Sequence, residues 1–172
     1  EFGQSSDEVL VVVEPGQTHL NKHLSAAYQF VFGRGWGYVR DLDHVAGFES
    51  HGLRYYRMTR TPADLWEVSH IELVGILTQP EPIVYMTDKM PSMDQIKNGT
   101  TRKIDGFEEK GLEALTKGDD LFIAEKDNTI RMLGALRATK SCLQCHETAK
   151  EFDLLGAFSY TIRRKVPATL PT

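Results

Sequence analysis

The chain contains only two cysteines, Cys142 and Cys145, and a histidine, His146, directly follows the second. The spacing Cys-x-x-Cys-His is the attachment signature of a c-type haem. The two thiols add across the two vinyl groups of the porphyrin, and the histidine faces the iron as its proximal ligand. Because one turn of backbone can present both thiols, the sequence predicts one covalently bound haem, with its iron held by His146.

Three other uses of two cysteines at this spacing stay open, although the chain fits them less well. A structural zinc site normally has four Cys or His ligands, so two histidines would have to complete it. A thioredoxin-like redox pair belongs at a helix N-terminus early in a βαβ unit, whereas Cys142 and Cys145 lie near the C-terminus. A disulfide between them would close a very short loop and stabilise the fold little.

Length and charge limit the other classes of function. The 172 residues suffice for a single domain over 1–172, in which we expect an N-terminal helical layer over 1–44 and a haem domain over 45–164. The net charge of -4 and the lack of a basic run argue against a nucleic-acid partner. No apolar stretch of the sequence approaches the length of a membrane helix.

The haem motif also predicts where the protein works. Haem c is attached outside the bacterial cytoplasm, so we expect a periplasmic or otherwise extracytoplasmic location. An export signal or membrane tether is then expected upstream of Glu1. The sequence does not identify the redox partner protein, and it leaves open whether the chain forms a homodimer.

Apolar periodicity predicts a mixture of helices and strands. A helix is expected from Thr18 to Gly33, and a second from Asp105 to Leu115 with Asp105 as its N-cap. Residues 90–102 are expected to form a loop with a helical turn. Trp66–Leu77 is expected to be a buried strand, with a helix as the alternative. The remaining predicted strands are Val9–Val13, Val45–Met58, Ile83–Met86, Leu121–Ala124, Ile130–Ala138 and Leu154–Arg163.

A short internal similarity connects the last two predicted strands. Leu133-Gly134-Ala135-Leu136 precedes the motif, and Leu155-Gly156-Ala157-Phe158 follows it. If these strands are antiparallel neighbours, the haem-bearing segment is the connection between them. Glycine inside a strand often marks a close approach to the backbone, here of a porphyrin edge to Gly134 and Gly156. A β-bulge or a coincidence of small residues explains the two glycines equally well.

A strand, then Cys-x-x-Cys-His, then a polar connection ending in Leu154–Ser159 resembles the haem-c-binding PAS-like sensor domains of bacteria. Several short segments extend the resemblance to secreted haem c proteins of planctomycete-type bacteria, over roughly residues 45–163. It implies an α+β fold: a PAS-like antiparallel sheet with flanking helices and the haem-attachment segment between the last two strands. The segments are 47–51, 72–75, 84–86, 131–134 and 142–146.

Haem reactivity depends on the group opposite His146. Among the other histidines we favour His51 as the sixth ligand, because it lies in the resembling region beside a glycine, and place His70 second. Met132 lies on a strand expected to flank the haem. Arg137 is the candidate partner for the haem propionates, since arginine pairs bidentately with carboxylates. Arg131, Lys140 and Lys150 are further candidates, with a solvated charged face as the alternative for each.

The leading functional hypothesis is a monohaem c-type protein acting in electron transfer or redox sensing. The alternative is a sensor of diatomic gas or another small ligand, which requires an open sixth position on the iron. A third hypothesis is a peroxidase-like enzyme. It is less favoured because no compact pair of histidine and arginine in the sequence suggests a distal acid-base site.

Overall fold

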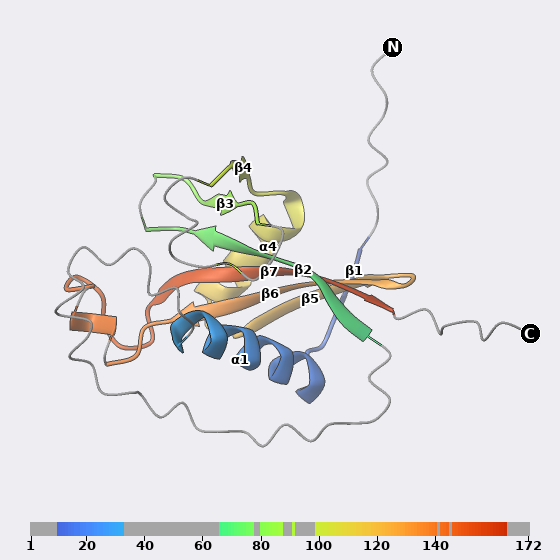
Figure 1. Ribbon diagram of the computed structural model, residues 1–172, viewed down its shortest axis with the longest axis horizontal. Helices are drawn as coiled ribbons and strands as arrows, with labels where there is room; N and C mark the ends of the chain where they lie inside the picture. Colours follow the sequence, from blue (N-terminus) through green and yellow to red (C-terminus); the bar gives the residue numbers. More distant parts are fainter. Residues whose placement is uncertain are drawn as a thin grey trace, which may run out of the picture.

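The computed structural model describes residues 10–32, 66–77, 80–87, 91, 99–140, 142–144 and 146–164 (Figure 1). Within these residues the chain forms seven strands, two α-helices and one short 3₁₀ helix, η1. The α-helices are α1 (Gln17–Phe32) and α4 (Gly106–Thr116), and η1 is Cys142–Gln144. The strands are β1 (Val11–Val13), β2 (Trp66–Gly75), β3 (Ile83–Tyr85), β4 (Thr101–Lys103), β5 (Leu121–Lys126), β6 (Thr129–Arg137) and β7 (Leu154–Arg164).

All seven strands belong to one antiparallel sheet in the order β1-β5-β6-β7-β2-β3-β4. The last strand, β7, lies in the centre, with β6 on one side and β2 on the other. Tyr160 of β7 is therefore opposite both Met132 of β6 and Ile71 of β2. The predicted α+β class with an antiparallel sheet is confirmed.

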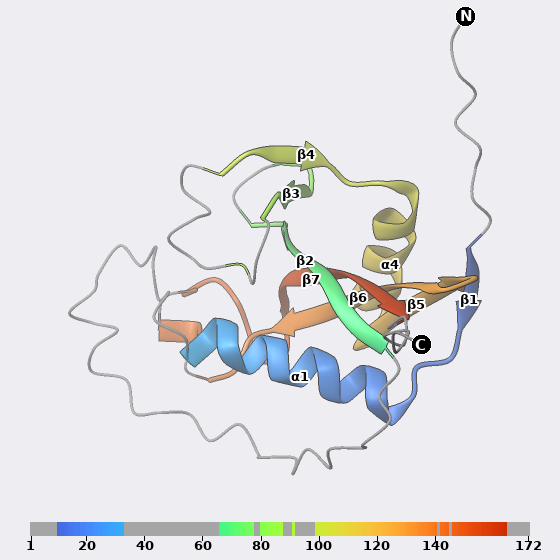
Figure 2. The ribbon, with the colours of Figure 1, turned by 45° about the vertical axis from the view of Figure 1, so that its right-hand side comes forward.

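The two faces of the sheet are covered by different helices (Figures 1 and 2). Successive side chains of a strand point to opposite faces, and β7 follows this rule. Phe158, Tyr160 and Ile162 pack in the cluster that includes Ala26 of α1. Ala157 packs instead in the cluster that includes Leu115 of α4. The alternating sequence of β7 thus builds an apolar core on each side of one sheet.

Helix α4 begins and ends where the sequence predicts. The Asp105 carboxylate accepts a hydrogen bond from the Glu108 backbone N–H, and the Glu108 carboxylate accepts one from Asp105 N, each at 2.9 Å. This reciprocal capping box satisfies two amides of the first turn. The helix stops at Lys117, and Gly118 follows with φ +118°, a left-handed conformation that glycine adopts without steric cost.

Two elements clarify or correct the sequence predictions. Trp66–Gly75 is a strand, so the helical alternative there is excluded. Thr101 and Arg102 were expected to belong to a loop with a helical turn, but Thr101–Lys103 forms β4, in which Arg102 pairs with Val84 of β3. Three residues are too few to show a strand period, so pairing with β3 decides their conformation. The predicted strand Val45–Met58 and the predicted boundary between residues 44 and 45 lie outside the described residues.

The predicted antiparallel pairing of the last two strands is confirmed. Gly134 is opposite Phe158, and Leu136 is opposite Gly156. The connection over residues 138–153 extends from one end of the sheet, where Figure 1 shows η1 beyond the end of β6 and the start of β7. Cys142 and His146 both lie in this connection, which we call the motif loop.

Candidate functional site

The backbone of the motif loop makes one helical turn at the cysteine motif. Cys142 N donates to Thr139 O, and His146 N donates to Cys142 O, both at 2.9 Å. A bond from residue i+4 to residue i closes one turn of backbone, so it holds the two residues close together. Cys142 and His146 are therefore presented together. Cys145 lies outside the described residues.

The side chains of Cys142 and His146, the two described ligand residues of the motif, are available to bind a group. Cys142 is a half-buried free thiol, and its Sγ lies 3.3 Å from Thr139 Oγ1. His146 is exposed, and within the described part of the chain its imidazole makes no hydrogen bond or ion pair. A neutral imidazole nitrogen without a partner can act as a metal ligand.

Backbone hydrogen bonds close the base of the motif loop. Ala138 N donates to Asp153 O, and Phe152 N donates to Ala138 O, both at 2.8 Å. On the same side of the loop, Lys150 N donates to the Asp153 carboxylate at 2.7 Å. The loop is thus mounted on the ends of β6 and β7, and the rigid sheet fixes where the motif can lie.

Arg137, the predicted propionate partner, is already committed to other groups. Its guanidinium donates to Leu115 O at 2.6 Å, in the last turn of α4, and to Asp119 O at 2.9 Å, just after the helix. Carbonyls of a last helical turn lack partners inside the helix. The guanidinium also donates to Phe152 O at 3.3 Å. Arg137 therefore links α4 to the motif loop.

The two glycines predicted to lie beside a porphyrin have protein neighbours instead. The imidazole of His23, from α1, occupies the space where a side chain of Gly134 would lie. A Cβ on Gly156 would lie 3.0 Å from the carbonyl oxygen of Val74 on β2. Packing of α1 and pairing with β2 therefore account for the small residues at these positions.

His23 forms a buried polar pair with Tyr160 under α1. Its Nε2 lies 2.8 Å from Ala135 O, and its Nδ1 lies 2.6 Å from the Tyr160 hydroxyl. A carbonyl can only accept, so Nε2 carries the proton and the tyrosine hydroxyl donates to Nδ1. Burial lowers the pKa of His23 and raises the pKa of Tyr160 well above its ordinary value. Both groups are neutral near pH 7.

The other predicted ligands are not near the motif loop. His70 lies opposite Thr161, five residues along β7 from Gly156, or about 16 Å at the rise of a strand. Its Nε2 lies 3.5 Å from a Glu72 carboxylate oxygen. Met132 is fully buried in the core against α1. His51 lies outside the described residues.

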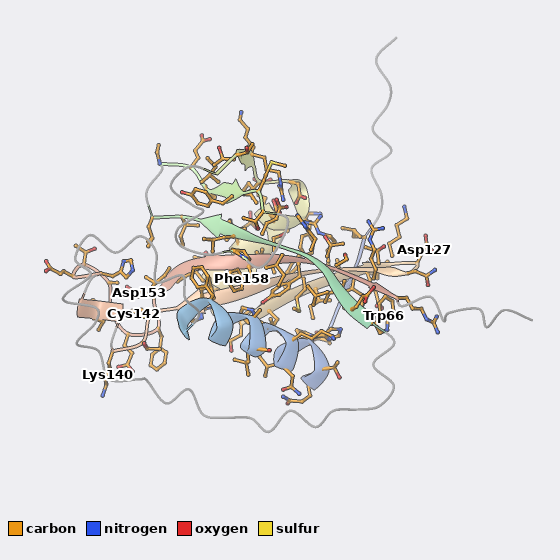
Figure 3. All side chains as sticks on the ribbon, in the orientation of Figure 1. Trp66, Asp127, Lys140, Cys142, Asp153 and Phe158 are labelled. Atoms are coloured by element: carbon orange, nitrogen blue, oxygen red, sulfur yellow. The ribbon has the colours of Figure 1, made fainter. Side chains whose placement is uncertain are left out.

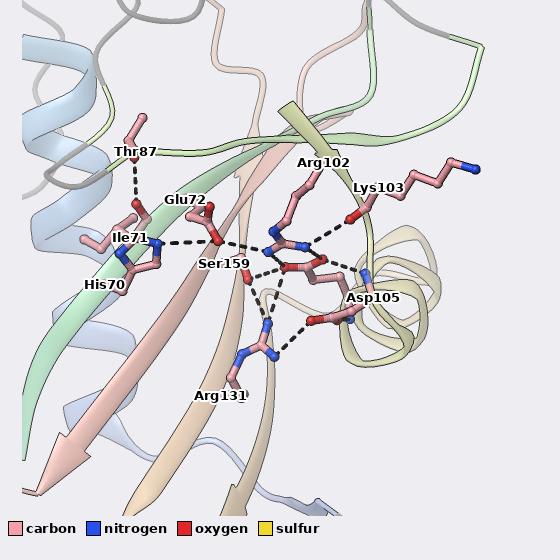
Figure 4. A network of polar contacts seen from close by, with 10 residues as sticks. His70, Ile71, Glu72, Thr87, Arg102, Lys103, Asp105, Arg131 and Ser159 are labelled. Atoms are coloured by element: carbon pink, nitrogen blue, oxygen red, sulfur yellow. Dashed lines mark hydrogen bonds and ion pairs between the residues drawn. The ribbon is translucent and has the colours of Figure 1, made fainter. Parts of the chain in front are cut away.

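A buried ionic network lies on the α4 face of the sheet, and the sequence did not predict it (Figure 4). Glu108 is completely buried and accepts from Arg102 at 2.6 and 2.9 Å and from the Ser159 hydroxyl at 2.9 Å. Hydrogen bonding to Glu108 raises the pKa of Arg102. Arg102 also contacts Glu72 at 2.9 Å. The network thus joins α4 to β2, β4 and β7.

Arg131, the second arginine of the network, lies far from the motif loop. It donates to the Asp105 carboxylate at 3.0 Å and to Glu108 at 3.3 Å, and its guanidinium lies 4.6 Å from the centre of the Phe107 ring. The capping pattern of α4 placed Asp105 and Glu108 near each other in the sequence. Their partners come from distant strands, so local pattern alone could not identify them.

Comparison with family models, with curated proteins and with solved structures found no match to this chain. Within the described ranges, no helix is long and apolar enough to cross a membrane. In the same ranges, no three His, Cys, Asp or Glu side chains converge to hold a metal ion by themselves.

We predict that Gly134→Ala destabilises the fold by about 1–3 kcal/mol, the usual effect of overpacking. The new methyl group would collide with the His23 ring, which two hydrogen bonds hold in place. Urea unfolding measures the loss. Gly106→Ala is the matched control, because a Cβ at that position meets nothing within 4 Å. Equal stability of the two variants would contradict the described position of His23.

We also predict that His23 makes stability depend on pH in the haem-free chain. Its pKa in the folded state is below 6.5, so the unfolded chain binds this proton more tightly. Stability is therefore kept above pH 6.5 and falls below it, by at most about 1.4 kcal/mol per pH unit for one proton. The fall continues until the pH reaches the lowered pKa of the folded state.

Urea unfolding at several pH values between 7.5 and 5.5 checks this prediction. We expect His23→Leu to have a smaller slope of stability with pH than the unsubstituted chain. His19→Gln is the comparison and should reduce the slope less, because burial also lowers the pKa of His19 but that residue is more accessible. The same slope in His23→Leu and in the unsubstituted chain would disprove the assignment.

Proposed function

We propose that this chain is a monohaem c-type, cytochrome-like protein with a PAS-like fold, acting in electron transfer or redox sensing. One observation carries the proposal: the hydrogen bond from His146 N to Cys142 O closes a single turn of the motif loop and so holds the two residues close together. The attachment chemistry requires this arrangement, because thiol and imidazole must reach the same porphyrin. When bound, the haem supplies a one-electron iron couple.

The residues of the motif loop fit the requirements of this group. Cys142 is a free thiol, and the His146 imidazole is accessible and without a partner in the described residues. Cys145 would provide the second thioether. The closed base of the loop, with Arg137 tied to α4, would hold these ligands in a fixed position relative to the sheet. Ligands held in a fixed position favour fast electron transfer, since little rearrangement then accompanies the change of charge on the iron.

The strand order supports the PAS-like part of the proposal. If the strands are counted from β2, the first strand (β2) and the last strand (β7) are neighbours in the middle of the sheet. Strands β6 and β5 follow β7 on one side. Such a sheet places its final hairpin, β6 and β7, across the centre of the domain. The motif loop is the connection of this hairpin, as the resemblance to haem-c-binding PAS-like domains implies.

The described histidines narrow the choice of the sixth ligand. Both nitrogens of His23 are hydrogen-bonded, and His70 is far from the motif loop in the sheet register. His19 Nδ1 accepts from Gly16 N at 2.9 Å, at the start of α1. His44 and His51 both lie outside the described residues, and we propose His51 as the sixth ligand because it belongs to the resembling region and lies beside a glycine. The alternative function, sensing of a small gas molecule, requires that no side chain hold this position.

The proposal includes an extracytoplasmic location, because haem c is attached outside the bacterial cytoplasm. It also includes a redox partner protein, which would dock near an exposed haem edge. The third hypothesis, a peroxidase-like enzyme, would need an arginine and a histidine on the distal side of the haem. Arg102, Arg131 and Arg137 are committed to carboxylates or helix carbonyls, so none of the three favours this function.

We predict that the chain, matured in a periplasm with haem-attachment machinery, keeps haem on a denaturing gel. Cys145→Ala should retain one thioether and shift the reduced absorption band in alkaline pyridine, because one vinyl group stays unsaturated. The double variant Cys142→Ala, Cys145→Ala should lose all covalent haem. Glu147→Ala, an exposed change in the same loop, is the control and should behave as the unsubstituted chain. Haem that survives loss of both cysteines would contradict the proposal.

We predict that the oxidised and reduced proteins are low-spin and that carbon monoxide leaves the reduced spectrum unchanged. His51→Ala should open the sixth position, so its reduced spectrum should shift on addition of carbon monoxide. His44→Ala is the control, with an unchanged spectrum. If the unsubstituted protein is high-spin and binds carbon monoxide, the sensor of small gas molecules becomes the better description.

A further inference from the structure

Phe152, in the motif loop, has an unfavourable backbone conformation. Its φ is +72°, and Asp127 is the only other non-glycine residue of the described ranges with a positive φ. This left-handed region suits glycine and, less well, asparagine or aspartate, whereas a bulky side chain there is strained. Strained residues of this kind persist only where the surrounding structure imposes them, and they cluster at functional sites.

Contacts of the Phe152 backbone impose the conformation. Its N–H donates to Ala138 O at 2.8 Å, and its carbonyl accepts from the Arg137 guanidinium at 3.3 Å. The pairing of β6 and β7 shifts register beside this point, between Leu136 and Arg137. Glycine would meet these backbone requirements with less strain. The phenyl ring therefore needs an explanation other than the turn itself.

The ring also gains little from the protein around it. Phe152 is 70% exposed, the most exposed large hydrophobic side chain in the described part of the chain. A single exposed apolar residue is common on protein surfaces. An exposed aromatic ring on a strained backbone is uncommon, because burial of the ring does not offset the cost of the strain. Both properties at one residue indicate that another group covers the ring.

Phe152 and the cysteine motif share the closed base of the motif loop. Ala138 accepts from Phe152 N, and the next residue, Thr139, accepts from Cys142 N. Figure 3 shows Asp153, the neighbour of Phe152, and Cys142 at the same end of the sheet. The group expected at Cys142 is flat, apolar and large, and aromatic rings pack well on such a surface.

We infer that Phe152 is a further cofactor-binding residue, whose ring packs against the edge of the haem attached to Cys142 and shields it from water. This inference rests on the proposed function. A shielded haem is harder to oxidise, because water stabilises the more highly charged oxidised iron. Phe152 would thus raise the redox potential of the haem and slow attack by small oxidants.

The test compares Phe152→Gly with Asp127→Gly. The second variant is the control, because it relieves the same kind of backbone strain in the turn between β5 and β6, away from the motif. In the haem-free chain, both variants should raise the midpoint of urea unfolding. In the protein with haem, Asp127→Gly should leave the redox potential unchanged. Phe152→Gly should lower it and should speed haem bleaching by peroxide several-fold. Phe152→Tyr keeps the ring and should restore both properties.

A direct measurement is the proton NMR spectrum of the Phe152 ring. The ring signals are assigned as those that are missing from the spectrum of Phe152→Gly. These signals should shift when haem is attached, whereas those of Val12, an exposed residue on β1, should not. An unchanged potential and unshifted signals would overturn the inference and leave the proposed function intact. A lower unfolding midpoint of haem-free Phe152→Gly would also overturn it, by showing that the ring stabilises the protein itself.

Two further outcomes would also overturn the inference, for different reasons. If the unsubstituted protein elutes as a dimer on gel filtration and Phe152→Gly elutes as a monomer, a second copy covers the ring and the inference is wrong. If the unsubstituted chain acquires no covalent haem, the proposed function fails, and this inference fails with it.

Discussion

The pairing of β7 with β6 and β2 is the constraint on which the rest of the structure depends. This central strand sends Phe158, Tyr160 and Ile162 to the α1 face and Ala157 and Ser159 to the α4 face. A shift of register by one residue would exchange the two sets and bury the wrong side chains. The same pairing closes the motif loop at the end of the sheet, so it also determines where Cys142 and His146 lie.

The two faces of the sheet stabilise it by different means. The α1 face is apolar and contains one neutral polar pair, His23 with Tyr160, in which the described bonds satisfy both nitrogens. The α4 face buries the Glu108 carboxylate, which is tolerated because two arginines and a hydroxyl surround it. Removing one partner of such a group leaves a buried charge uncompensated. Arg137 donates both to Leu115 O of α4 and to Phe152 O of the motif loop. The packing of α4 and the position of the motif are therefore physically connected.

Features with a local physical cause could be predicted from the sequence. The alternation in Leu154–Arg163 predicted a strand, and the Asp105 cap predicted the start of α4. The two glycine-containing segments raised the pairing of β6 with β7 as a condition, which the structure meets. The partners of these residues could not be predicted. Arg102 meets Glu108 only because β4 pairs with β3, and His23 covers Gly134 only because α1 crosses β6. The positive φ of Phe152 could not be predicted either. A left-handed backbone position is normally occupied by glycine, and a phenylalanine in the sequence does not indicate one.

Covalent attachment of one haem to the motif loop is the central claim, and the intact mass of the chain tests it most directly. The protein would be matured with haem-attachment machinery, extracted with acidified organic solvent to remove any haem that is not covalently bound, and weighed by mass spectrometry. The account predicts the mass of the chain plus one haem, with both cysteines unreactive toward a thiol reagent. The mass of the chain alone, with Cys142 and Cys145 both reactive, would contradict it.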